Sequence, residues 1–171
     1  MNNFTKGLAL ALTIFGFSTT DTFAQKTATA TASATIVTPI AITKNQDLMF
    51  GIFASGSTLG TVVVPTTGSR TQTGGVVLPN GIITTVQPAT FTVTGQASYN
   101  YAITLPSSHT ISNGTVFMTV DNFIHNATAT PQLSGAGSQT FSVGATLNVA
   151  ADQAAGSYLS VTPFVVQVVY N

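Results

Sequence analysis

The chain of 171 residues contains no cysteine, no tryptophan and no glutamate, and it carries only four basic and four acidic side chains. Without cysteine no disulfide can form, so packing and hydrogen bonding must stabilise the fold. Binding to nucleic acid or to an acidic membrane surface needs clustered positive charge, which this composition does not supply. These absences argue against both functions.

Catalysis needs positioned nucleophiles, bases or metals, and there are only two histidines to supply them. His109 lies in the segment PSSHT, which predicts a surface turn, and His125 follows Asp121 by four residues. An Asp–His pair could bind a metal or form part of a triad. With no cysteine or glutamate to complete such a set, we expect no enzyme activity, no catalytic, cofactor or metal site and no small-molecule substrate.

The first 24 residues have the pattern of a secretory signal peptide. Lys6 supplies a positive charge, and residues 7–17 form an apolar run too short to span a bilayer. Residues 22–24, Thr-Phe-Ala, form a small-x-small cleavage site, so we expect the exported chain to begin at Gln25.

The remainder predicts strands rather than helices. Threonine is the commonest residue, and apolar and polar side chains alternate with period two. Turn residues separate the runs, notably Pro79-Asn80-Gly81, a hairpin signal, and the polar loop 65–75. The strands that we predict are 139–149, 89–94, 97–105, 115–120, 47–53, 61–64, 75–78 and 82–86. This spacing is typical of an all-β, immunoglobulin-like sandwich with Greek-key connections.

The C-terminal segment predicts a long apolar strand that ends one residue before the C-terminus. One face carries Phe164, Val166, Val168 and Tyr170, and the other carries Val165, Gln167 and Val169. Because both faces are largely apolar, such a strand needs a neighbour or a cover to avoid aggregation.

The segment 26–37 is low in complexity and alternates almost perfectly between alanine and threonine or serine. One face consists of Ala28, Ala30, Ala32, Ala34 and Ile36. Pro39 separates this segment from the short apolar run at 40–43. Three interpretations stay open: a flexible leader, the first strand of the domain, or a strand meant for another molecule.

The segment 152–158, DQAAGSY, has the spacing of a tyrosine corner, in which a tyrosine hydroxyl returns to nearby backbone. Asp152, Gly156 and Tyr158 are its expected members. Asp47 and Asp152 are expected to form turns.

The run Ala155-Gly156-Ser157-Tyr158, the alternating strand after it and the penultimate Tyr170 resemble the C-terminal signature of chaperone–usher pilin subunits. The similarity is closest to the archaic, spore-coat-U-like branch. The chain also resembles a group of exported bacterial pilin-like domains that begin with an Ala/Thr-rich strand. That second similarity covers most of residues 28–171, including Pro39-Ile40 and residues 48–51.

The resemblance implies a sandwich that lacks one strand, with residues 38–171 as the domain and 25–37 as an N-terminal extension. The face of Phe164, Val166, Val168 and Tyr170 would line the groove, and the alanine face of the extension would be the donor strand for a sister subunit. It also implies a periplasmic chaperone, an outer-membrane usher, transit through the periplasm and a final place on the cell surface, with a role in adhesion or biofilm formation. The chain departs from the archaic branch in lacking cysteine, and Pro163 interrupts the start of the last strand.

Two alternatives remain at this stage. The first is a self-complete β-sandwich that binds at the surface or in the periplasm and uses 28–37 as its own first strand. The second is a small outer-membrane barrel, since the length permits eight strands.

Overall fold

The computed structural model describes residues 25–81 and 84–171. The chain divides into two units, of which the first includes the described residues 25–35 and the second is the compact unit of residues 36–171. The predicted signal peptide, residues 1–24, lies outside the described residues. Within the described ranges, no helix has the length and apolarity needed to cross a membrane.

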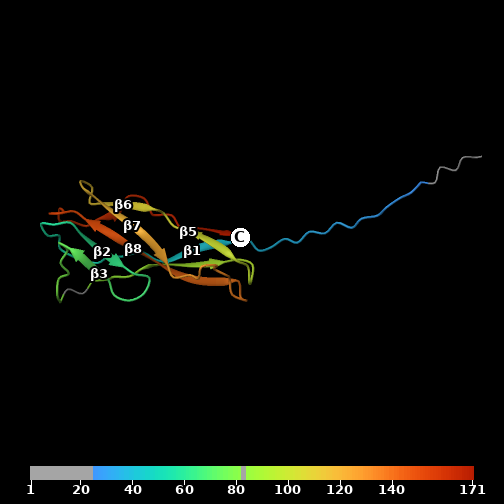
Figure 1. Cartoon of the computed structure of the whole chain (residues 1–171), viewed down its shortest axis with the longest axis horizontal. Helices are drawn as coiled ribbons and strands as arrows, with labels where there is room; N and C mark the ends of the chain where they lie inside the picture. Colours follow the sequence, from blue (N-terminus) through green and yellow to red (C-terminus); the bar gives the residue numbers. More distant parts are fainter. Residues whose placement is uncertain (1–24, 82–83) are drawn as a thin grey trace, which may run out of the picture. The chain divides into compact units, whose positions relative to one another are not determined.

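The second unit is an all-β, sandwich-like domain, as its alternating sequence predicts (Figure 1). The structure does not describe positions 82 and 83, and none of the described residues between 36 and 171 is helical. The strands are β1 Ala41–Gln46, β2 Gly60–Val64, β3 Thr71–Gly74, β4 Ala89–Thr94, β5 Tyr101–Thr104, β6 Ser108–Ser112, β7 Phe117–His125, β8 Ser138–Val149, β9 Leu159–Ser160 and β10 Gln167–Tyr170.

The twelve-residue strand β8 organises the larger sheet, whose main path runs β1-β4-β8-β7-β6-β9. Its first half pairs with β4, with Ala89 opposite Val143, and its second half pairs with β2, with Val64 opposite Ala145. Strand β7 pairs with the other edge of β8, and β3 extends the sheet beyond β2. One long strand thus carries two successive neighbours on the same edge, which lets the sheet curl over itself.

Strands β10 and β5 form a separate antiparallel pair, with Tyr170 opposite Tyr101. This pair packs on the β4–β8 part of the larger sheet, because Tyr101 is fully buried in a cluster with Phe91, Val93 and Phe141. The rings of Phe91 and Phe141 stack with their centroids 5.7 Å apart. A second cluster, built on Val62, Val120 and Leu147, fills the other end of the domain.

The strongest sequence patterns became strands where they were predicted. The runs 139–149, 89–94 and 61–64 are β8, β4 and β2, and the run 115–120 lies within and just before β7. Burial alternates along β4, as period two requires. Asp152 also lies in a turn, as expected, with φ at 51°.

Several shorter predictions were wrong. The segments 47–53 and 75–78 form only isolated bridges, at Met49–Gln87 and Ala54–Val77. The polar loop 65–75 instead contributes β3, whose residues are all exposed, and His109 lies in β6 rather than in a turn. Gly81 has a positive φ of 78°, as the turn prediction requires, but residues 84–86 are not a strand. Positions 82 and 83 of that predicted strand lie outside the described residues.

Candidate functional site

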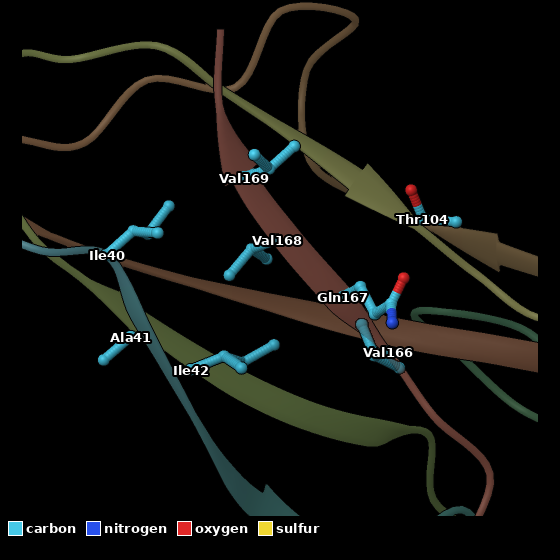
Figure 2. Close-up of a pocket in the computed structure, with 8 residues that line it drawn as sticks. All are labelled: Ile40, Ala41, Ile42, Thr104, Val166, Gln167, Val168 and Val169. Carbon is cyan, nitrogen blue, oxygen red and sulfur yellow. The ribbon is translucent and has the colours of Figure 1, made fainter.

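A groove lies between the free edge of β1 and the free edge of β10 (Figure 2). Figure 2 shows Ile40 and Ile42 on the side of β1 and Val166 and Val168 on the side of β10, with these apolar side chains directed into the space between the two strands. The remaining lining residues are Ala41, Thr104, Gln167 and Val169. The groove is thus apolar at its floor and bordered by two lengths of strand backbone.

Among the residues that the structure describes, each bordering strand has a partner on one edge only. Strand β1 pairs with β4, and β10 pairs with β5, but β1 and β10 do not pair with each other. The two strands run in opposite directions, because the start of β1 and the end of β10 lie at the same end of the groove. Each therefore presents unpaired N–H and C=O groups towards the groove, which is the condition for adding a strand.

The C-terminal strand is placed with its predicted faces. Phe164, Val166, Val168 and Tyr170 are half-buried and pack on the cluster around Phe91 and Phe141. On the opposite face, Val165 is 62% exposed and Val169 is 58% exposed. The ladder itself covers only 167–170, and residues 163–166, including Pro163, precede it without regular pairing. Pro163 itself cannot join a ladder, because proline lacks the N–H that a ladder position uses.

Strand β1 and the residue before it form one wall of the groove, and this wall was not predicted from the sequence. Ile40 and Ile42 are half-buried, whereas Ala41 and Thr43 are exposed. This alternation is visible in the sequence after Pro39, but four residues are too few to identify a groove wall. The opposing strand is more than 120 residues away in the sequence, so only the fold brings the two walls together.

A set of hydrogen bonds around the Tyr170 hydroxyl joins the residues next to one end of the groove, just before Ile40 and just after Val169. This hydroxyl donates to the carbonyl of Thr38 at 2.7 Å and accepts from the backbone N–H of Gln96 at 2.6 Å. The N–H of Thr38 in turn donates to Oε1 of the Gln96 side chain at 3.2 Å. We call these three residues, Thr38, Gln96 and Tyr170, the Thr38 clamp.

The predicted donor face is not part of any strand in this structure. Residues 25–40 have no strand assignment, and residues 25–36 are exposed. Ile36, the bulkiest member of the face, is 97% exposed. Residues 28–37 are therefore not a strand of their own domain in this structure, and the first strand among the described residues is β1 at Ala41–Gln46.

The tyrosine corner is present. The Tyr158 hydroxyl donates to the carbonyl of Ala154 at 2.7 Å and accepts from Nε2 of Gln153 at 2.9 Å. Asp152 anchors the same turn, because its N–H donates to the carbonyl of Gly56 at 2.8 Å. Gly156 has a φ of 153°, close to the extended limit of the positive-φ range.

The charged and polar residues make structural contacts. Asp121 accepts from Asn148 at 2.9 Å, His125 packs edge-on against Phe141, and His109 is hydrogen-bonded to Ser160 at 2.9 Å. In the part of the chain that the structure describes, no cluster of three or more His, Cys, Asp or Glu side chains could hold a metal ion. Burial raises the pKa of the Tyr101 hydroxyl above its ordinary value of 10.0.

The comparisons with known proteins give one match. A family model described as "Domain of unknown function (DUF4402)" matches residues 40–170, which begin at the groove wall and end at Tyr170. No curated protein and no solved structure matches the chain.

Proposed function

The chain belongs to the DUF4402 family, and we propose that it is a structural subunit of a surface fibre or coat, in which a strand of one copy fills the groove of the next. The observation that carries this proposal is the pair of unpaired strand edges on either side of an apolar floor. A strand placed there would hydrogen-bond to both edges and cover Val166 and Val168. Recognition by strand addition uses these two elements, main-chain bonds for affinity and alternate side-chain pockets for specificity.

The occupant that fits best is the segment 28–36 of a second copy. Its alternation matches a strand with one face towards a groove floor. The four alanine methyl groups would contribute about 3 kcal/mol on burial and Ile36 about 2 kcal/mol more. Each ladder hydrogen bond adds about 1 kcal/mol. Small side chains also suit this floor, because the half-buried Ile and Val side chains already occupy much of the space.

The clamp sets the direction of the incoming strand. Each copy's own chain passes Thr38 at the Tyr170 end of its groove. A donor that runs antiparallel to β10 leads to its own domain at the opposite end, so successive copies follow one another head to tail. A donor in the reverse direction would place the second domain at the end where the first copy's extension begins, and the two would compete for the same space.

The composition is consistent with an assembled, exported protein. A chain with eight charged side chains and zero net charge has little electrostatic repulsion between copies, which favours association over dispersal. We propose a periplasmic chaperone that covers the groove in transit, an outer-membrane usher, and a final place at the cell surface. We propose that its role there is in adhesion or biofilm formation.

The test compares the two faces of the extension in the full-length chain, expressed with its own leader and purified after export. In one variant, Ala30→Asp and Ala32→Asp put charges on the alanine face, and in the matched control Thr29→Asp and Thr31→Asp put the same charges on the other face. We expect the wild type and the control to form fibres by electron microscopy and the alanine-face variant to stay unassembled. The proposal would be refuted if both variants assembled equally well. It would also be refuted if the wild type formed no fibres even in the presence of its chaperone and usher.

A further inference from the structure

The Thr38 clamp has a second consequence, which rests on the proposed function. Residues 28–36 and the groove belong to the same chain, so a strand that fits the groove of a neighbour could also fold back into its own. Self-insertion would saturate the groove inside a single molecule and end assembly. We propose that the clamp keeps the extension from entering its own groove and reserves the groove for a second copy, with Tyr170 and Gln96 as positioning residues.

The argument starts from the direction of the chain. Since β1 leads away from the clamp along one wall of the groove, the preceding residues can enter the same groove only by reversing direction over residues 37–39. The inserted strand would then form a hairpin with β1, antiparallel to it. A donor from another copy needs no such turn and enters parallel to β1.

The clamp opposes this turn because both backbone groups of Thr38 are already bonded. Its carbonyl accepts from Tyr170 and its N–H donates to Gln96. The Tyr170 hydroxyl is itself held by the bond that it accepts from the Gln96 N–H, so the group that donates to the Thr38 carbonyl stays in place. Forming a reverse turn at Thr38 requires breaking these bonds. Each bond that must be broken lowers the population of the self-inserted form about fivefold.

The sequence of residues 37–39 also disfavours the reverse turn that self-insertion needs. Tight hairpin turns favour Asn, Asp or Gly, which accept a positive φ, whereas this segment is Val37-Thr38-Pro39. Valine and threonine are β-branched, and a residue before proline is held in the extended region. Pro39 also fixes its own φ and has no N–H to close the turn.

Further support comes from the space beneath the Tyr170 hydroxyl. Gly95 lies so close to this oxygen that a side chain there would collide with it. The ring of Tyr170 also packs edge-on against Tyr99 with centroids 5.7 Å apart. The hydroxyl is therefore held at one position, at the one place where the extension joins the domain.

Because the native chain has no cysteine, disulfide trapping can measure self-insertion directly. Ala32→Cys and Val168→Cys place one thiol on the donor face and one on the groove floor. In dilute solution only a thiol pair within one chain can close, so the rate of intrachain trapping reports the self-inserted population even when it is small. At high concentration, disulfides between chains report exchange between copies.

In this background we compare Gln96→Ala and Tyr170→Phe, each of which removes one bond to Thr38, with Tyr99→Phe as the matched aromatic control. We expect intrachain trapping to rise about fivefold in each clamp variant, the factor for one lost hydrogen bond, and to stay unchanged in the control. Interchain trapping should not rise. If Tyr170→Phe fails to fold, Gln96→Ala decides the question alone, because it removes only a half-buried loop side chain.

The outcomes separate this inference from the function on which it rests. If the clamp variants and the control form interchain disulfides equally well and also form intrachain disulfides at equal rates, the proposed role of the clamp is refuted. Strand exchange between copies would then still hold. Absence of interchain disulfides in every protein at high concentration would refute strand exchange itself. A fivefold intrachain increase in the clamp variants alone supports the proposal.

Discussion

Gly95 leaves the space that the Tyr170 hydroxyl occupies, although 75 positions separate the two residues in the sequence. The hydroxyl hydrogen-bonds the N–H of Gln96, directly after this glycine, and the carbonyl of Thr38. A Cβ on residue 95 would overlap the hydroxyl oxygen and would also lie in tight contact with the ring carbon that bears it. The close approach of strand β10 to the Gln96 loop therefore depends on glycine at this position.

Gly95→Ala should displace Tyr170 and destabilise the domain. Overpacking of this kind costs about 1–3 kcal/mol, and the loss of the Tyr170 bonds adds to it. The control is Gly135→Ala, since a Cβ there meets open space and the φ of Gly135 is not positive. Thermal unfolding followed by circular dichroism measures both variants. A Gly95→Ala protein as stable as Gly135→Ala would contradict the close packing described here.

A charge on the groove floor should prevent strand addition. We expect Val168→Asp to abolish assembly, because a donor strand would have to bury an unpaired carboxylate, at a cost of several kcal/mol. Val165→Asp is the matched control, since Val165 is 62% exposed and does not line the groove. Sedimentation and electron microscopy of the exported chain give the measurement, with circular dichroism to confirm folding. Fibres of normal yield from folded Val168→Asp protein would place the interface elsewhere.

The tyrosine corner should contribute measurably to stability. Tyr158→Phe removes the bond to the Ala154 carbonyl and the bond from Gln153 while keeping the ring. We expect a loss of about 1–2 kcal/mol in the free energy of unfolding, measured by urea denaturation. Tyr99→Phe serves as the comparison, because Tyr99 is 44% exposed and water can satisfy its hydroxyl. Equal midpoints for the two variants would show that the corner is energetically neutral.

Stability should fall at alkaline pH through Tyr101. Burial raises the pKa of its hydroxyl in the folded state above the unfolded value of 10.0. The unfolded chain therefore releases this proton at a lower pH than the folded protein does. The contribution of Tyr101 to the free energy of unfolding is fully present below pH 10 and is lost as the pH rises from there towards the folded pKa. Tyr101→Phe should show a shallower decline above pH 10 in urea denaturation, together with a lower stability at pH 7 from the lost bond to Gln139. A decline as steep as that of the wild type would exclude Tyr101 as its source.

The pattern of apolar and polar residues was enough to predict the class of the fold and the faces of its longest strands. The period-two alternation of 139–149 and 89–94 specified β8 and β4, because a slip of one residue would expose every apolar side chain. The same logic placed Phe164, Val166, Val168 and Tyr170 on the inner face. Tyr158 was also predictable, since its hydroxyl bonds backbone only four residues away.

Which strands have partners, and which strand edges stay unpaired, depends on the path of the whole chain in three dimensions. Short runs such as 47–53 have too few alternating residues to specify a strand, and this segment forms only an isolated bridge. The polar residues 71–74 are a strand, β3, because they pair with the edge of β2. The groove joins Ile42 to Val168, and the clamp joins Thr38 to Gln96 and Tyr170. Local propensity contains no information about such pairs, because their proximity results from the path of the whole chain.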